Sequence, residues 1–313
     1  MFKIIGKTNI DFIGMRKVSF ILSTILIILG IVAFVNILLG TANMGIDFTG
    51  GTMIQGNFQK PIDIENLRLS LTEGGFPEAT IQALHTEGVE NSYLIRVKTL
   101  DEDATPSGES TMDKILNTVA KDNRFEGNPF QMDSHQSIGA IVGKELRKDA
   151  TWAVLLAVVG ILLYISIRFD FRFGVAATIA TFHDVLAVLG LFWIFGIEID
   201  LLVITALLTL GGYSLTDTVV VFDRIRENLK MFRKKGDFVA TINASINEVI
   251  SRTIITSMTT LMVVVILLFF GGQVLFTFAL ALTIGVIVGT YSSVFVASPI
   301  VVEWEARSPK RFK

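Results

Sequence analysis

The sequence contains no cysteine and only three histidines: His85, His135 and His183. The absence of cysteine excludes disulfides, thiolate nucleophiles and cysteine-based metal sites. With so few histidines a multi-histidine metal centre is not expected either, so we predict neither a metal nor another cofactor. The formal net charge is −2, which is not the basic excess typical of proteins that bind nucleic acid.

Apolar residues are what the chain has in abundance, at 51% of its 313 residues, and they are gathered in long runs. The first run, from Val18 to Leu39, is longer than the apolar part of a signal peptide, so we interpret it as a retained span. Only helices and closed barrels satisfy the backbone inside a bilayer. We therefore predict an α-helical polytopic membrane protein with six transmembrane helices. The five further runs are approximately 149–167, 173–195, 201–222, 253–270 and 273–302.

The distribution of positive charge sets the expected orientation. With a cytoplasmic N-terminus, the segments 1–17, 168–172, 223–252 and 303–313 are all inside, and together they carry 17 of the 27 Lys and Arg residues. The short outside loops at 196–200 and 271–273 carry none. The positive-inside rule therefore predicts that both termini are cytoplasmic and that the region 40–148 is extracytoplasmic. On this interpretation helix 1 (18–39) tethers that region to a five-helix block at 149–302, which includes the cytoplasmic segment 223–252.

Segment 40–148 has the pattern of a small α+β domain. Strand-like stretches at 52–58, 80–84, 92–97 and 130–139 alternate with helical ones at 63–74 and 111–121, with Asp63 and Ser110 as N-caps and an acidic loop at 101–109. The order β-α-β-β-α-β is the ferredoxin-like pattern. In the cytoplasmic segment, the apolar spacing from Asp237 to Ile250 predicts an amphipathic helix on the membrane surface, beside basic residues that suit anionic lipids.

Ionisable residues inside the predicted spans are the candidates for function, because charge is costly in hydrocarbon. His183 and Asp184 fall near the middle of the third span, Asp217 in the fourth, and Arg252 at the mouth of the fifth. Burial disfavours the charged form of a carboxylate, so Asp217 is suited to hold a proton and release it when water or a cation such as Arg252 approaches. An imidazole titrates near neutrality and can take part in the same relay.

Each candidate also has a purely structural interpretation. An intramembrane Asp can hold helices together by bonding hydroxyls, and Ser214, Thr216 and Thr218 lie close to Asp217 in the sequence. Arg252 can be an interfacial anchor. The spacing of Gly285 and Gly289 is typical of close helix packing. The residues at 223–227 suit a solvated, salt-bridged helix end.

Four motifs in order resemble one family. They are Gly45-Ile46-Asp47-Phe48-Thr49-Gly50-Gly51-Thr52, His183-Asp184, the stretch from Gly212-Tyr213-Ser214 through Asp217 to Asp223-Arg224 and Asn228, and Ile246-Asn247-Glu248 with Ser251-Arg252-Thr253. The glycines after the first span suit a tight connection, and no Gly-Lys-Ser/Thr follows them, so the stretch is not a nucleotide site and no enzyme activity is expected. Over nearly the whole chain, these motifs resemble the SecF type of the SecD/SecF family of bacterial protein-export subunits.

The resemblance implies membership of the resistance–nodulation–division superfamily and a role in proton-driven protein translocation across the cytoplasmic membrane. It implies a SecD partner, contacts with the SecYEG channel and YajC, and an unfolded polypeptide as substrate. The proton-relay residues of the family correspond to Asp217 and Arg252. One departure is Thr216, where the family usually has Asn. The alternatives are a small-molecule exporter of the same superfamily, which would need a partner or dimer to reach the usual number of spans, and a subunit that only stabilises the translocon.

Overall fold

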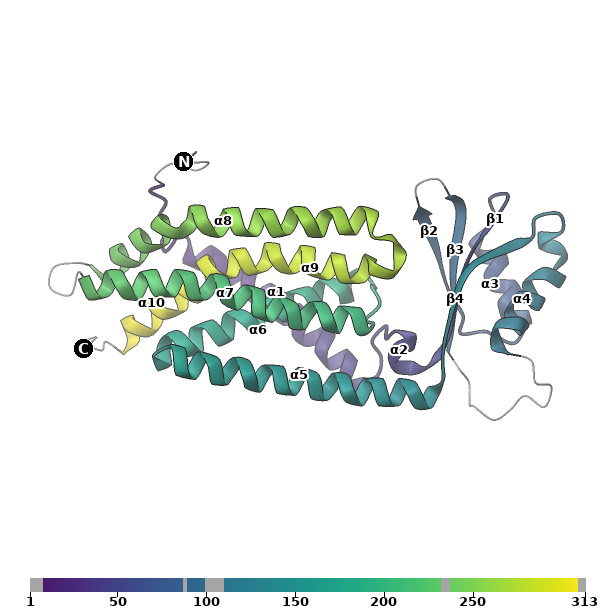
Figure 1. The fold of residues 1–313 in the computed structure, drawn as a ribbon, viewed down its shortest axis with the longest axis horizontal. Helices are drawn as coiled ribbons and strands as arrows, with labels where there is room; N and C mark the ends of the chain where they lie inside the picture. Colours follow the sequence, from purple (N-terminus) through teal and green to yellow (C-terminus); the bar gives the residue numbers. More distant parts are fainter. Residues whose placement is uncertain (1–7, 87–88, 99–109, 232–236, 309–313) are drawn as a thin grey trace. The chain divides into compact units, whose positions relative to one another are not determined.

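The computed structural model describes residues 8–86, 89–98, 110–231 and 237–308, and it divides into two compact units (Figure 1). The helical unit comprises Met1–Asn43 and Ala153–Lys313, and the sheet unit comprises Met44–Trp152. The acidic loop predicted at 101–109 lies outside the described residues, as do 1–7, 232–236 and 309–313 of the predicted cytoplasmic segments.

Six helices in the described part of the chain are long and apolar enough to cross a membrane, which confirms the predicted number of spans. They are α1 (Arg16–Leu39), α5 (Ala140–Arg168), α6 (Phe171–Ile194), α7 (Leu201–Met231), α8 (Phe238–Phe270) and a sixth that comprises α9 (Gly272–Ser292), η2 (Ser293–Ala297) and α10 (Ser298–Arg307). The helix α5 begins nine residues before the apolar run that predicted it. It therefore contains residues of both units.

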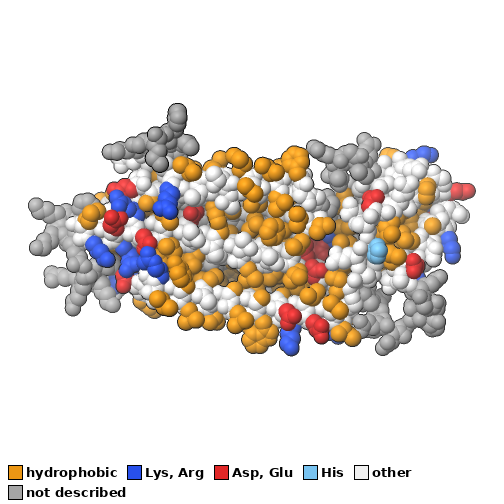
Figure 2. Space-filling model, in the orientation of Figure 1, with side chains coloured by type: hydrophobic (Ala, Val, Ile, Leu, Met, Phe, Trp, Pro, Cys, Tyr) orange, Lys and Arg blue, Asp and Glu red, His pale blue; other side chains and the backbone are white. Residues whose placement is uncertain are grey.

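The outer surface of the helical unit is apolar where a bilayer would surround it. Figure 2 shows hydrophobic side chains over the middle of the helices, with Lys and Arg gathered toward the end where α10 lies. On α5, Leu156 and Ile167 are 67% and 87% exposed. Lipid tails solvate such side chains without the cost that water would impose.

Glycines allow α1 to pack closely against α6. A Cβ added to Gly190 of α6 would lie 2.7 Å from the backbone nitrogen of Gly30, and one added to Gly30 of α1 would lie 2.3 Å from the carbonyl oxygen of Leu186. Small residues at a crossing let two backbones approach in this way, and dispersion then supplies the attraction in lipid. The structure thus differs from the sequence interpretation of the first helix as a tether, because α1 is packed into the helical unit.

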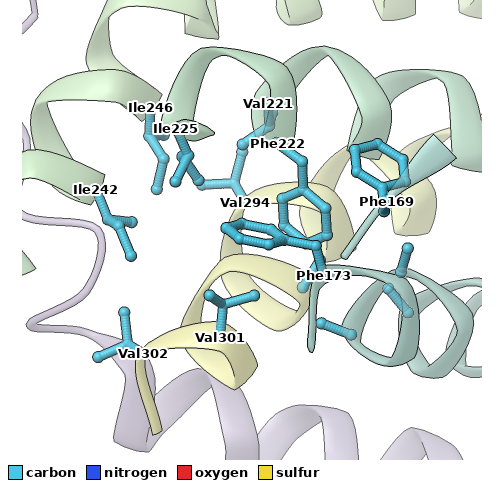
Figure 3. Packing of buried hydrophobic residues seen from close by; sticks show 14 of the residues in the cluster. Phe169, Phe173, Val221, Phe222, Ile225, Ile242, Ile246, Val294, Val301 and Val302 are labelled. Carbon is cyan, nitrogen blue, oxygen red and sulfur yellow. The ribbon is translucent and has the colours of Figure 1, made fainter. Parts of the chain in front are cut away.

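The amphipathic stretch after Asp237 is not a separate surface helix, so that interpretation was wrong. It is the first part of α8, which runs without a break to Phe270. Its apolar face is buried in the protein: Figure 3 shows Ile242 and Ile246 among side chains of α7 and α10, and both are fully buried. Periodicity identifies an apolar face but does not say whether protein or lipid covers it.

The described part of the N-terminal segment lies against this same stretch of α8. Asn247 bonds both backbone groups of Ile10, with its Oδ1 2.9 Å from the amide nitrogen and its Nδ2 2.9 Å from the carbonyl oxygen. The amide of Ile13 donates to Asn243 Oδ1 at 3.1 Å. Phe12 and Ile13 are buried in the hydrophobic cluster of Figure 3. Side chains one helical turn apart on α8 therefore hold the chain that precedes α1.

The last span changes its helical form at η2, a π-helical segment. Pro299 has no N–H to donate to the carbonyl of Phe295, four residues earlier, and its ring repels that carbonyl. The wider π turn directly before the proline accommodates the missing hydrogen bond and relieves the clash with the carbonyl. The Oγ of Ser298 also donates to the carbonyl of Ser293 at 3.2 Å.

The sheet unit has the predicted ferredoxin-like order. Its elements are β1 (Gly51–Phe58), α3 (Ile64–Glu73), β2 (Thr80–Thr86), β3 (Val89–Val97), α4 (Thr111–Lys121) and β4 (Phe130–Ile138), and its antiparallel sheet has the order β2-β3-β1-β4. Two short helices, α2 (Ile46–Thr49) and η1 (Asn123–Phe125), were not predicted. Asp63 and Ser110 cap α3 and α4 as expected, accepting from backbone amides at 3.0 and 3.2 Å.

Candidate functional site

Asp184 is the most enclosed carboxylate of the helical unit, with an exposure of 0%. Its Oδ1 lies 2.8 Å from Nδ1 of the neighbouring His183. Its Oδ2 accepts a hydrogen bond from Ser292 Oγ of α9 at 2.8 Å and another from Ser214 Oγ of α7. One side chain of α6 is thereby bonded to two other helices, and each bond helps to offset the cost of burying a carboxyl group.

The glycines of α9 allow this arrangement. A Cβ on Gly289 would lie 3.3 Å from Ser214 Cβ and 3.6 Å from Asp184 Oδ2, and a Cβ on Gly285 would lie 2.6 Å from the side chain of Leu210. Larger residues at these positions would push α9 away from α7 and lengthen the hydrogen bonds to Asp184. The predicted role of Gly285 and Gly289 in close packing is confirmed.

Asp217 lies in a second polar cluster, built from α7, α8 and α9. The side chain is 6% exposed, and its Oδ2 accepts from Ser257 Oγ of α8 at 3.3 Å. Ser257 Oγ is also 3.2 Å from the hydroxyl of Tyr213 and 2.7 Å from Thr290 Oγ1. Thr256 of α8 is a second hydroxyl at the Asp217 carboxylate, and it also donates to carbonyls of its own helix. Asp217 therefore has fewer donors than Asp184, and Tyr213 and Thr290 also contact its main partner, Ser257. A carboxyl group held so lightly can change partners at a lower cost.

The two clusters are joined by short stretches of the same helices. Ser214 and Asp217 are three residues apart on α7, while Ser292 and Thr290 are two apart on α9. The ring of Tyr291, between them, lies 6.3 Å from the ring of His183. Any displacement of α9 along α7 acts on both carboxylates.

The neighbours of Asp217 in the sequence do not bond it, contrary to the sequence interpretation. Ser214 donates to Asp184 instead. Thr216 is exposed and donates to the carbonyl of Gly212 in its own helix at 3.0 Å. Thr218 Oγ1 is buried and has no partner among the described residues. Residues adjacent on a helix point in different directions, so closeness in sequence was the wrong guide.

Arg252 is exposed, on α8, and lies near enough to Asp217 to act on its charge. Within the described ranges no ion pair links the two side chains. His183 is fully buried, and its Nε2 has no hydrogen-bond partner in the described part of the chain. The structure thus brings His183 to Asp184, keeps Asp217 in a separate cluster, and leaves Arg252 unpaired near it.

Three hydroxyl residues of this site were missed by the sequence analysis: Ser257, Thr290 and Ser292. The sequence offered only a weak sign that these hydroxyls belong to the site. Ser257 lies one helical turn after Thr253, and Thr290 and Ser292 follow the glycine pair of the last span. Hydroxyls are common in transmembrane helices, where they often bond their own backbone, as Thr290 also does to Val286.

Charged residues that follow the polar clusters on α7 tie helices together. Asp223 pairs with Arg168 of α5, and Arg224 pairs with Glu227 and with Glu248 of α8. These exposed pairs stabilise only weakly. The salt-bridged helix end predicted from sequence is present, with partners on other helices as well.

The glycine motif of the sheet unit forms a tight connection, as expected. Gly45 is the N-cap of α2, and Phe48 is buried. Gly50 has φ 72°, and Gly51 has φ 147°, where a Cβ would lie 2.5 Å from the carbonyl oxygen of Val97. Only glycine takes up such backbone angles in so little space.

A family model described as protein export membrane protein SecD/SecF, C-terminal, matches residues 118–307, and one described as the SecD/SecF GG motif matches residues 42–62. A protein translocase subunit SecF from Thermodesulfovibrio yellowstonii is 50% identical over 302 residues, which cover 96% of each chain. The SecF subunit of Pseudomonas aeruginosa is 37% identical over 294 residues, covering 94% of this chain and 91% of that one.

A solved structure is similar throughout. The crystal structure of SecDF, a translocon-associated membrane protein from Thermus thermophilus, matches 96% of this chain with a TM-score of 0.79 and 36% identity. The chain spans only 39% of the length of that SecDF chain.

Proposed function

The chain belongs to the SecD/SecF family of protein-export membrane proteins, and on that basis we propose that it is a SecF-type accessory subunit of the Sec translocon. Together with a SecD partner, it uses the proton motive force to promote late steps of protein translocation across the cytoplasmic membrane. The similarity to SecF subunits over nearly their full length supports this function over that of an independent exporter.

The observation that carries the proton-driven part of the proposal is the environment of Asp217. It is a nearly buried carboxyl group inside a span, bonded by the hydroxyls of Ser257 and Thr256, with a cation close by on the same helix α8. In such a place the neutral acid is favoured until a positive charge or water reaches it. In our proposal Asp217 takes up and releases the proton, and Arg252 stabilises the ionised form in one conformation.

His183 and Asp184 are the second station of the proposed relay. The imidazole of His183, whose Nε2 has no partner among the described residues, lies against the hydrogen-bonded carboxylate of Asp184. Helices α7 and α9 contribute residues both to this pair and to the Asp217 cluster. One proton crossing 100 mV supplies about 2.3 kcal/mol. Conformations of one protein differ by a few kcal/mol, so one or two protons suffice to shift helix packing.

The proposed setting follows from the same membership. The protein is a membrane protein, and we place both termini in the cytoplasm and the region 40–148 outside, in a non-enzymatic role. The sequence matched in the SecDF chain is two-fifths of that chain, which supports a partner that supplies the remainder. SecYEG, YajC, anionic lipids and the unfolded polypeptide are further proposed partners. We assign Gly45, Asp47, Phe48, Gly50, Gly51, Tyr213, Ser214, Asp223 and Arg224 structural roles.

Export by proteoliposomes with and without an imposed pH gradient tests the proposal. They contain the full complex with either the wild-type chain or Asp217→Asn. The amide cannot take part in proton exchange, so we expect export with the gradient to fall to the rate seen without it. The matched control is Asp170→Asn, the same change at an exposed carboxylate at the start of α6.

Two outcomes would contradict the proposal. If the Asp217→Asn complex still responds to the gradient, the relay is wrong and a subunit that only stabilises the translocon is the better description. Purification of the chain alone as an active homodimeric pump for small molecules would favour the exporter alternative.

A further inference from the structure

The strand β4 is an edge of the sheet that the described residues leave open. It pairs with β1 on one side, and no strand lies on its other side in the sheet order β2-β3-β1-β4. All residues from Gln131 to Ser137 are exposed. Alternate backbone N–H and C=O groups of an edge strand point away from its sheet and remain free to pair with another chain.

The helices α2 and α4 contact β4, and Phe130 packs against the core, but the residues from Gln131 to Ser137 stay exposed. Ile54 of β1 is fully buried against α3 and α4, and its partner across the ladder is His135 of β4. Side chains of paired residues lie on the same face of a sheet, yet His135 is exposed. The helical layer therefore leaves the side chains from Gln131 to Ser137 exposed, and the outer edge of β4 is open along this stretch.

A bulge limits how much of β4 offers a regular edge. The register shifts between Gln55 and Gly56, which leaves Asp133 as the extra residue, and Asn57 Nδ2 donates to its carboxylate at 3.1 Å. Charge and bulges are the devices by which edge strands avoid indiscriminate pairing. On the far side of this bulge, the five residues from Ser134 to Ile138 pair with β1 in unbroken register.

The side chains from Ser134 to Ile138 suit a ligand that binds only transiently. Ser134, Gln136 and Ser137 are uncharged and hydrogen-bonding, so they neither repel nor select a particular side chain. Stable subunit interfaces use roughly 20–30 residues a side and have an apolar core. A five-residue polar edge falls far short of both. Recognition by main-chain hydrogen bonds alone is what a protein needs in order to bind extended chains of varied sequence.

We infer that the outer edge of β4 from Ser134 to Ile138, here called the β4 edge, binds an extended segment of the translocating polypeptide by β-strand addition. The inference rests on the proposed function, and it identifies where that function contacts its substrate. The pairing is short and polar, and it is released when the chain moves on.

Site-specific photo-crosslinking tests the β4 edge. A photoreactive amino acid replaces Gln136 in the full chain, assembled with its partners, while a secreted precursor is stalled in the channel by a tightly folded carboxy-terminal domain. The matched control is Gln82, also exposed, on β2 at the opposite edge, where its neighbours Ile81, Ala83 and Leu84 are half-buried or buried. We expect several-fold more precursor adduct from position 136 than from position 82, with loss of the adduct once the precursor completes export.

Three results would overturn the inference: equal adduct from both edges, no adduct from position 136 in a complex that assembles normally, or an adduct only with a partner subunit or a second copy of this chain. Position 134 serves as the second probe if the 136 variant does not assemble. The same membranes report on the proposed function through Asp217→Asn. If that variant loses the gradient response while position 136 gives no adduct, the β4 edge is wrong and the proposed function stands. If the gradient response persists, the proposed relay is wrong whatever the adduct shows.

Discussion

At the scale of single residues, the two intramembrane carboxylates differ in how firmly they are held. Asp184 bonds side chains of its own helix and of two others, whereas Asp217 bonds two hydroxyls of one helix, and both of these have other partners. A group whose donors come from several helices is costly to disturb, and one whose donors also bond other groups is less so. We therefore expect substitutions at Asp184 to lower stability and those at Asp217 to affect mainly the proton response.

Replacing Asp184 by alanine leaves the hydroxyl of Ser214 buried without its acceptor, and leaves Ser292 with only the carbonyl of Gly289 in its own helix. A buried hydroxyl without an acceptor costs about 1–3 kcal/mol, so we expect a clearly lower midpoint of thermal unfolding for the protein purified in detergent. Asp184→Asn keeps an acceptor oxygen and is expected to lose less. Thr216→Ala, at an exposed hydroxyl bonded to its own helix, is the control. Equal unfolding midpoints for wild type and Asp184→Ala would contradict this prediction.

In the sheet unit, the pKa of Asp122 is lowered from 3.8 to about 2, chiefly by the side-chain hydrogen bond from Arg124, which outweighs the opposing effect of burial. A lowered carboxyl pKa stabilises the fold at pH values above the ordinary pKa, and that contribution disappears as the pH falls through the lowered one. We expect Arg124→Gln to destabilise the sheet unit at pH ~6 and to differ little from wild type near pH ~2. Urea unfolding followed by hydrogen exchange of peptides from 110–126 measures the difference.

The control for this prediction is Arg68→Gln, which removes an ion pair with Glu65 between two half-exposed side chains. Exposed pairs of this kind contribute little, so its stability should follow that of wild type at every pH. A constant difference between Arg124→Gln and wild type down to the lowest pH would show that the arginine acts by packing and not through the Asp122 carboxylate.

The residues that carry charge in the membrane were predictable because a charged side chain stands out in an apolar run. Their partners were not. Ser257 is 40 residues from Asp217, and Ser292 is 108 residues from Asp184. Nothing local marks such pairs. Thr216, which departs from the family pattern, proves to face away from Asp217, a fact that follows from helix packing alone.

At the scale of whole elements, glycine decides which helices come close. Gly190 has the backbone of α1 within contact distance of its missing Cβ, while Gly160 of α5 has nothing within 4 Å. We expect Gly190→Val to reduce the yield of folded protein and its unfolding temperature, because overpacking costs at least about 1–3 kcal/mol and a backbone neighbour cannot rotate away. Gly160→Val is the matched control, and it should behave as wild type. Size-exclusion profiles and thermal unfolding in detergent measure both, and equal behaviour would mean that the crossing is not closely packed.

The lengths of elements were harder to predict than their number. The apolar runs located six helices, but α7 and α8 continue well beyond the runs at 201–222 and 253–270. Hydropathy measures the part of a helix that can lie in lipid, and a helix can continue into water wherever its apolar face is covered by protein. The strand pattern and the caps of the sheet unit were predictable, since alternation and N-cap residues act locally.

At the scale of the whole molecule, the charge distribution predicts the sidedness of the two units. The chain has no cysteine, so a single introduced cysteine reports its own position without background. We expect Glu126→Cys, in the sheet unit, to react with a membrane-impermeant maleimide in intact cells whose outer membrane is permeable to the reagent. Lys230→Cys, near the end of α7, should react only after the inner membrane is opened. The reverse pattern would invert the orientation that we propose.

The π-helical segment η2 has a consequence for the phase of the last span. Each residue of an α-helix turns the chain by about 100°, and a π turn holds one residue more than an α turn. The side chains of α10 are therefore set about a quarter-turn away from where an unbroken helix would put them. That offset lets Thr290 and Ser292 point into the polar clusters while Val301 and Val302 reach the hydrophobic cluster of Figure 3. The number of residues in η2 therefore matters as much as their identity. Deleting one residue would rotate α10 relative to α9, and either the polar residues of α9 or the valines of α10 would then face outward.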